Sequence, residues 1–286
     1  MVSHTRSLRG APRGATDRVE GDLSVPGAAA QVIQAVRPVV TFNLVGYGVD
    51  REERDENLAT RLNAGLVEEI VRAVALLPPS QGWDGCRLVH VGSAFEYGSL
   101  SGPVREDAVC RPQSGYARSK LRGTEAVRDA VESGHVRAVV ARVTTVYGPG
   151  EHPHRLLPSL LRLRESPDLT LPLTKGEQER DFTYVGDVAE GLVRLAAVGP
   201  TPLGVVNLAT GVLTPLRTFV ETALDVLGLP ADRVATGALP YRPDEVWQGV
   251  LDLTRLQAAT GWRPETEVRE GIRRTIDASE SVTTIS

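Results

Sequence analysis

Three side chains in the middle of the chain have the types and the spacing needed for a proton-transfer site. Tyr116 and Lys120 are four residues apart, so on a helix the phenol and the ammonium lie on the same face, one turn apart. Ser93 follows a largely apolar run at residues 88–92, and a strand there would deliver its hydroxyl. One strand and one helix can therefore bring an alcohol, a phenol and an amine around a single substrate oxygen.

The chemistry expected of this set is general acid–base catalysis through Tyr116. A tyrosine with a pKa of about 10 is a poor base at neutral pH, and lowering that pKa to about 7 requires about 4 kcal/mol of phenolate stabilisation. The Lys120 cation acts in this direction, while Ser93 can donate to the substrate oxygen and orient it. The alternative is a solvated tyrosine beside a lysine on a surface helix.

The elements that must position these residues follow an α/β pattern, in which apolar clusters alternate with helix-like segments. The spacing predicts helices over 27–36, 56–77, 116–133 and 187–198, and strands over 1–7, 19–23, 39–45, 87–91, 136–143 and 204–208. After residue 208 the pattern predicts helix and loop. The predicted fold is a Rossmann-like doubly wound parallel sheet with a smaller lobe after it.

Length and composition are ordinary for a soluble globular enzyme: 286 residues, of which 41% are hydrophobic and 24% charged. A formal net charge of −4 gives no reason to expect nucleic-acid binding. No apolar run approaches the roughly 20 residues that cross a bilayer, and residues 1–14 lack the apolar stretch of a secretory signal. Cys86 and Cys110 have no metal-ligand spacing, which favours a reduced, cytoplasmic setting.

Eight stretches, taken in order, resemble one family, the extended short-chain dehydrogenases/reductases, also called the NAD-dependent epimerase/dehydratase family. The resemblance covers residues 18 to 275. The stretches are 21–23, 42–46, 93–98, Tyr116 with Lys120, Arg142 with 146–150, 179–188, 207–211 and 261–264. By this resemblance, Ser93, Tyr116 and Lys120 match the hydroxyl, acid/base and lysine positions of the family, and Lys120 would also hold the nicotinamide ribose.

The resemblance also implies residues that hold NAD or NADP. Asp22 and Leu23 match the pair that contacts adenine, with a turn carboxylate as the alternative for Asp22. Leu44, Val45 and Gly46 match the strand end that lines the cofactor.

For the substrate, the resemblance implies a nucleotide-linked hexose. Arg180 matches the arginine that meets the diphosphate, a role that suits the fork of donors on a guanidinium. Arg242 is a candidate second phosphate contact, with a surface ion pair as the alternative. Arg142 and Asp187 match positions that we interpret as structural.

Two departures from the family pattern narrow the range of expected reactions. Many dehydratases of the family carry an acidic pair directly after the hydroxyl residue, where this chain has Ala94 and Phe95. Glu96 comes one residue later and is expected on the opposite strand face. A 4,6-dehydratase is therefore disfavoured. Thr145 stands where the family often has an asparagine near the nucleotide sugar, so that contact is expected to be weaker or replaced.

The start of the chain differs most from the family pattern. Family members open with a strand, a Gly-x-x-Gly-x-x-Gly turn and a helix that hold the pyrophosphate. Residues 1–7 align instead with the second strand, so roughly thirty residues of the pattern are missing, and the glycines at 10, 14, 21 and 27 lack the strand-turn-helix context. Arg6 would then stand where NADP-preferring relatives place a base for the 2′-phosphate, with a plain surface arginine as the alternative.

Three explanations of this departure are open. The recorded start lies inside a longer gene, which we favour; or the region is lost and the remaining fold serves another purpose; or the early segment repacks and the cofactor binds differently. In a sheet of order 3-2-1-4-5-6, losing strand 1 leaves strands 2 and 4 without their shared neighbour. We expect dinucleotide binding by the chain as written to be impaired.

The leading hypothesis is an NAD(P)-dependent 4-ketoreductase or epimerase of a nucleotide-linked hexose, of the kind used in deoxysugar biosynthesis. Two alternatives stay open. One is a relative with lost or altered dinucleotide binding, acting as a cofactor-free acid/base enzyme or a binding protein. The other is a member acting on a ketide or steroid, against which Arg180 argues.

The predicted organisation is a Rossmann-like domain at 1–149, to which 186–207 return, and a substrate lobe at 150–185 and 208–286. The resemblance also implies a homodimer formed through the helices at 56–77 and 116–133.

Overall fold

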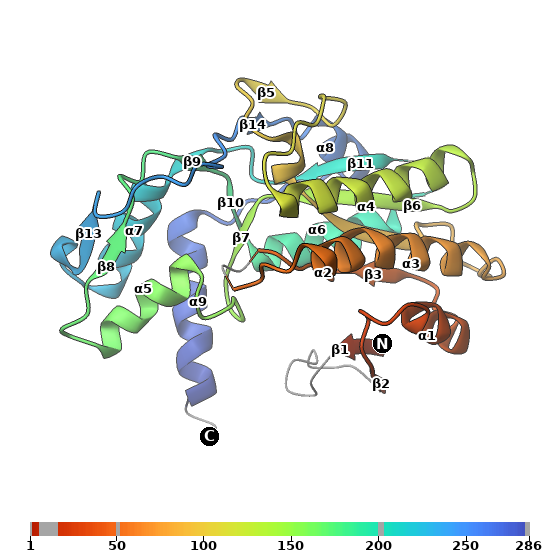
Figure 1. The fold of residues 1–286 in the computed structure, drawn as a ribbon, viewed down its shortest axis with the longest axis horizontal. Coiled ribbons are helices and arrows are strands. Elements are labelled where there is room, and N and C mark those ends of the chain that lie inside the picture. The colour runs from red at the N-terminus through yellow and green to blue at the C-terminus, as the bar shows by residue number, and fades with distance from the viewer. Residues whose placement is uncertain (1, 6–16, 50–51, 200–202, 284–286) are drawn as a thin grey trace.

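A four-stranded parallel sheet forms the centre of the molecule. The structure, a computed structural model, describes residues 2–5, 17–49, 52–199 and 203–283 (Figure 1). The strand order is β11 (Gly204–Leu208), β6 (Ala138–Val143), β4 (Leu88–Ser93) and β3 (Thr41–Asn43). Adjacent strands are parallel, as the alternation of strand and helix predicts.

Helices cover both faces of this sheet, which is why its central strands are almost entirely buried. On one face, α1 (Ala28–Val36), α3 (Leu66–Ala75) and α4 (Gly115–Glu132) pack on Leu88, Ala138 and Val140. On the other face, α6 (Val185–Ala197) and α8 (Thr254–Thr260) pack on Val89 and Val139. The alternation of neighbouring residues between two cores follows from the two-residue period of a strand.

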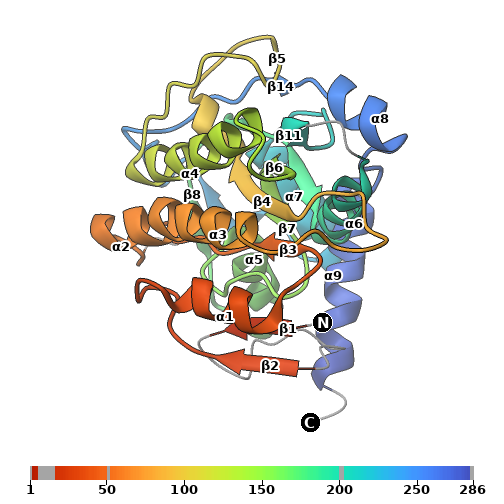
Figure 2. The same ribbon diagram turned by 90° about the vertical axis from the view of Figure 1, so that its right-hand side faces the viewer.

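A separate parallel pair lies beside the sheet. It consists of β1 (Val2–Thr5) and β2 (Asp17–Glu20), and Figure 2 shows it below α1, apart from β3. Within the described ranges the two strands form their own sheet, so the single doubly wound sheet that we predicted is present as a block of four strands and a pair. The edge at β3 carries exposed apolar side chains, with Phe42 41% and Leu44 61% exposed.

A second region, formed by segments before and after β11, has its own apolar core, which includes Leu160, Phe182, Phe219 and Ile272. Its elements are β7 (Thr145–Tyr147), α5 (Leu156–Glu165), β8 (Leu171–Leu173), β9 (Glu179–Arg180), β10 (Phe182–Tyr184), β12 (Thr214–Pro215), α7 (Leu216–Leu227), β13 (Val234–Thr236) and α9 (Val268–Thr283). A further pair joins β5 (Pro103–Val104) to β14 (Val250–Leu251). The expectation of helix and loop alone after residue 208 is wrong, because strands of two or three residues leave no readable period.

The helix predicted over 56–77 is divided. It begins at α2 (Glu56–Thr60), passes through one π-helical turn at Arg61–Gly65 and continues as α3, which ends at Ala75. Asp55 caps its start, because one carboxylate oxygen accepts from the backbone N–H groups of Asn57 and Leu58. None of the helices in the described part of the chain is long and apolar enough to cross a bilayer.

Candidate active site

Ser93 is held at the end of β4 by a capping box. Its Oγ accepts from the backbone N–H of Phe95 at 3.3 Å, and Glu96 Oε1 accepts from the N–H of Ser93 at 2.8 Å. This reciprocal pair is the Ser-x-x-Glu signature that opens a helix, here a short 3-10 turn over Ala94–Tyr97. Because Ser93 Oγ is used as an acceptor, its O–H stays available to donate.

Tyr116 and Lys120 come from the first turns of α4, whose start is capped by Ser114. Lys120 is 2% exposed, and its ammonium donates to the backbone carbonyl of Val91 at 2.5 Å. Tyr116 is half-buried, and its phenol lies close enough to Ser93 for that side chain to act on its pKa. The structure thus brings together the three residues that the spacing pointed to.

The expectation that Lys120 lowers the pKa of Tyr116 is wrong for the chain by itself. Burial raises the pKa of Tyr116 to about 12, and the hydrogen bond from Ser93 acts against it. The cation that lowers this pKa is Arg155, while the Glu96 and Glu53 carboxylates raise it. At neutral pH the phenol is therefore protonated and is a proton donor.

The side chain of Lys120 is less basic than an exposed lysine. Burial lowers its pKa to about 8, and the Glu96 carboxylate acts in the opposite direction. On the neighbouring strand, His90 is fully buried, and burial followed by the Lys120 charge holds its pKa well below the usual value. A neutral His90 adds no second positive charge beside the ammonium.

Glu96 lies in a different place from the one expected. The strand ends at Ser93, so the alternation of strand faces no longer applies and the turn folds Glu96 back into the core, where it is 0% exposed. Its Oε2 pairs with Arg142 Nε at 2.8 Å. The Arg142 guanidinium also donates to Cys110 Sγ at 3.2 Å and lies over the Tyr97 ring, with 4.3 Å to the centroid.

Arg180 is separated from the cluster by one aromatic ring, that of Phe95. Its guanidinium is 5.9 Å from the centroid of the Phe95 ring, and that ring meets Tyr116 edge-on at 6.5 Å. Arg180 is ion-paired to Glu245 and donates to the Val246 carbonyl at 2.7 Å. Glu245 therefore engages one terminal nitrogen of this guanidinium, Nη2.

Arg242 and Thr145 were also predicted to contact the substrate. Arg242 is exposed, close enough for its charge to lower the pKa of Arg180 after the larger effect of burial. Thr145 begins β7, and its backbone N–H donates to the Asp181 carbonyl at 3.0 Å.

Residues predicted to line the cofactor lie at the open end of β3. Leu44 and Gly46 are exposed and Val45 is half-buried. A Cβ built on Gly46 meets no heavy atom within 4 Å, whereas one built on Gly48 would lie 3.4 Å from the Tyr116 ring. An apolar, open strand end that leads directly to the phenol fits the nicotinamide end of a dinucleotide.

Asp22 and Leu23 lie in the turn after β2. The Asp22 carboxylate accepts from the Ser24 N–H at 2.9 Å, as the turn alternative requires. Leu23 packs on the core under α1 and α3, and Arg61 ties this turn to the π-helical segment by donating to the Ser24 carbonyl at 3.0 Å. Arg6 lies outside the described residues.

Asn63, in the π-helical turn, was missed by the sequence reasoning. It is 0% exposed and donates to the Tyr47 carbonyl at 2.7 Å and to Ser119 Oγ at 2.9 Å. It thereby joins the loop after β3 to the helix that carries Tyr116. An amide inside an apolar helix pattern was the available signal, and π-helical turns are frequent at functional sites.

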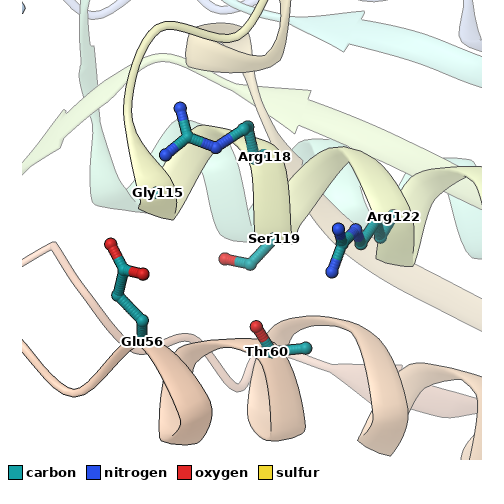
Figure 3. A pocket seen from close by; sticks show the side chains of 6 residues that line it. All are labelled: Glu56, Thr60, Gly115, Arg118, Ser119 and Arg122. Atoms are coloured by element: carbon teal, nitrogen blue, oxygen red, sulfur yellow. The ribbon is translucent and has the colours of Figure 1, made fainter.

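A polar pocket of about 130 Å³ lies between α4 and α2 (Figure 3). It is lined by Glu56, Thr60, Gly115, Arg118, Ser119 and Arg122. Ser93, Tyr116 and Lys120 are not among these residues, so the pocket is distinct from the proton-transfer cluster.

The doubly wound architecture and the serine–tyrosine–lysine cluster at the carboxyl end of its strands are those of a short-chain dehydrogenase-type enzyme. The chain belongs to the NAD dependent epimerase/dehydratase family, whose sequence model matches residues 2–209.

Relatives of known activity agree with this assignment. The chain is 34% identical to a dTDP-6-deoxy-L-talose 4-dehydrogenase (NAD(P)(+)) of Kitasatospora kifunensis, over 74% of this chain and 67% of that protein. It is 28% identical to the UDP-glucose 4-epimerase of Mycolicibacterium smegmatis, over 91% of this chain and 80% of that protein. Other curated relatives are matched over less than two thirds of their length, down to 44%.

Among solved structures, MoeE5 in complex with UDP-glucose and NAD has the same fold. The TM-score is 0.83 at 24% sequence identity, and the alignment covers 99% of this chain and 91% of that one.

Proposed function

We propose that the chain is an NAD(P)-dependent oxidoreductase of a nucleotide-activated hexose, acting as a 4-ketoreductase or as an epimerase at that carbon. The observation that carries this proposal is the contact of Ser93 with Tyr116 above a buried Lys120, one aromatic ring away from Arg180. A sugar between the phenol and the guanidinium would have its reacting oxygen at Tyr116 and its diphosphate at Arg180.

In ketoreduction, the phenol of Tyr116 gives its proton to the carbonyl oxygen as that oxygen gains negative charge, and Ser93 donates a second hydrogen bond to the same atom. In the reverse direction, the phenolate accepts the proton of the hydroxyl. The pKa of Tyr116, about 12, makes the donor form dominant at neutral pH.

NAD or NADP would supply or accept the hydride at the carbon that bears this oxygen. Leu44, Val45 and Gly46 would line its nicotinamide end, and Asp22 and Leu23 its adenine end. A 4,6-dehydratase stays disfavoured, because Glu96 is fully buried and paired with Arg142.

Tyr116→Phe tests the proposal. Turnover of a panel of dTDP- and UDP-linked 4-ketohexoses with NADH or NADPH, followed at 340 nm, should fall by about 10²–10⁴-fold. Affinity for dTDP or UDP, measured by calorimetry, should stay within twofold. The matched control is Tyr184→Phe, whose ring packs on Tyr147 in the second region. Wild-type turnover in Tyr116→Phe would rule out this use of the cluster.

A second candidate function is a family relative without redox chemistry, either a cofactor-free acid/base enzyme or a binding protein. The separate β1–β2 pair and the exposed edge at β3 favour it. Calorimetric titration with NADH and NADPH separates the two candidates, since micromolar binding eliminates this one. Absence of binding below millimolar concentration eliminates the redox enzyme for this chain.

We further propose that residues 1–149 and 186–207 act as the cofactor domain and that 150–185 and 208–286 act as the substrate lobe. A homodimer through the helices of residues 56–77 and 116–133, and a cytoplasmic setting in deoxysugar biosynthesis, complete the proposal. Cys86 and Cys110 are both free thiols, in keeping with a reducing compartment.

A further inference from the structure

The Glu96 carboxylate joins the two elements that carry the proton-transfer cluster, β4 and α4, to the neighbouring strand β6. Its Oε1 accepts from the Ser93 N–H of β4 at 2.8 Å and from Thr124 Oγ1 of α4 at 3.0 Å. Its Oε2 accepts from Arg142 Nε of β6 at 2.8 Å. A fully buried carboxylate with three such partners has little freedom to move.

We propose, building on the function proposed above, that Glu96 is a positioning residue of the active site. It fixes Ser93 relative to the helix that carries Tyr116 and Lys120, and it supplies the negative charge that keeps the buried Lys120 ammonium charged.

The positioning follows from the register of α4. Thr124 lies one helical turn beyond Lys120 and two beyond Tyr116, on the same face. A carboxylate bound to Ser93 and Thr124 at once sets the separation between the strand end and this face. The strand has to carry a glycine for this to happen, because a Cβ on Gly92 would lie 2.9 Å from Glu96 Oε1 and 3.1 Å from Thr124 Oγ1.

Lys120 and Glu96 lie among several other ionisable side chains. Lys120 is flanked by His90, which is neutral, and by Glu96, whose charge favours the ammonium. Glu96 in turn faces Arg142 from β6, with Tyr116 of α4 and Cys110 of the loop before α4 also within its field. Without the carboxylate, Arg142 and Lys120 would be two buried cations with no anion between them, which is strongly unfavourable.

The chain offers a direct measurement, because it has only two lysines, Lys120 and Lys175. In full-length protein labelled with ¹³C at lysine Cε, two signals are expected, and Lys175→Arg assigns them. Glu96→Gln should move the Lys120 titration midpoint toward acid by about one pH unit, the lower end of the effect of a neighbouring opposite charge. Leu195→Ala, a core change on α6, should lower the melting temperature and leave that midpoint in place.

Thr124→Val tests the positioning part without changing any charge, and it keeps the proposal testable if Glu96→Gln does not fold. Its kcat should fall about tenfold at unchanged KM, and the Lys120 midpoint should not move. A wild-type kcat in Thr124→Val would overturn the positioning role, and an unmoved midpoint in folded Glu96→Gln would overturn the charge role. If the wild-type protein turns over no nucleotide hexose while Glu96→Gln still moves the midpoint, the proposed function fails and the charge role stands.

Discussion

The proton-transfer cluster and the β3 edge lie at the carboxyl ends of adjacent strands, yet they are built in opposite ways. Ser93, Glu96 and Lys120 are between 0% and 4% exposed and are bonded to one another's elements. At β3, Phe42 and Leu44 are 41% and 61% exposed. The chemical groups are therefore fixed by internal bonds, whereas the strand end beside them offers open apolar surface.

This difference separates what each region contributes. Internal bonds position groups at the cost of burying charge, so the cluster is expected to be sensitive to small changes of shape and to lower the stability of the fold. Open apolar surface is expected to tolerate change and to matter for ligand affinity. The predictions below test these two behaviours against each other.

The largest expected difference between the two regions is in their response to an added methyl group, tested by a glycine-to-alanine change in each. Gly92→Ala forces the Glu96 carboxylate off the strand and should lower kcat at least a hundredfold and the unfolding free energy by about 1–3 kcal/mol. Gly46→Ala meets open space and should change the unfolding free energy by less than about 0.5 kcal/mol. Denaturant unfolding and steady-state kinetics on both variants check this. Equal destabilisation of the two would contradict the comparison.

The next effect concerns Arg180, the link between the cluster and the proposed diphosphate. Arg180→Ala should weaken binding of UDP or dTDP about 10- to 100-fold, in line with the loss of hydrogen bonds to a charged group. Glu245→Gln frees the guanidinium and should tighten binding. Calorimetry on both variants, with Arg217→Ala as an arginine control that binds the Lys175 carbonyl, provides the measurement. If both changes weakened binding equally, Glu245 would not be a competitor of the diphosphate.

The sequence was sufficient to predict that Ser93, Tyr116 and Lys120 come together, because a four-residue spacing on one helix and a hydroxyl at a strand end are local patterns. It also predicted β11 to the residue and α4 to within one residue at each end. What it failed to predict depends on partners far away in the chain. Glu245 lies 65 residues from Arg180, and the ion pair between them could not be read from either segment.

The position of the Glu96 side chain is a prediction from the sequence that is wrong. The pattern Ser-x-x-Glu was present, but residues 93–98 were interpreted with the alternation of a strand, so the side chain was placed on the wrong side. The direction of the Tyr116 pKa was also wrong, because burial outweighs the neighbouring cation and burial is not visible in a four-residue motif.

A smaller effect concerns the stability cost of Lys120. Because burial lowers its pKa from 10.5 to about 8, the folded state loses the proton before the unfolded state does, and stability rises with pH between these values. At pH 7 the charged form is disfavoured by folding, so Lys120→Met should be inactive yet more stable. The gain should shrink between pH 8 and 10.5, as seen by urea unfolding across that range. A gain that did not depend on pH would show that packing, not charge, is responsible.

The smallest effect is expected at the β3 edge. Leu44→Ser should leave the unfolding free energy within about 0.5 kcal/mol, because the side chain is 61% exposed. The affinity for NADH or NADPH should nevertheless fall several-fold, since Leu44 would no longer cover the ring with apolar surface. Val212→Ser, at 62% exposure in the loop after β11, controls for the loss of an exposed apolar side chain. If Leu44→Ser destabilised the fold as strongly as Gly92→Ala, the edge would be a structural element like the cluster, and the contrast between the two regions would not hold.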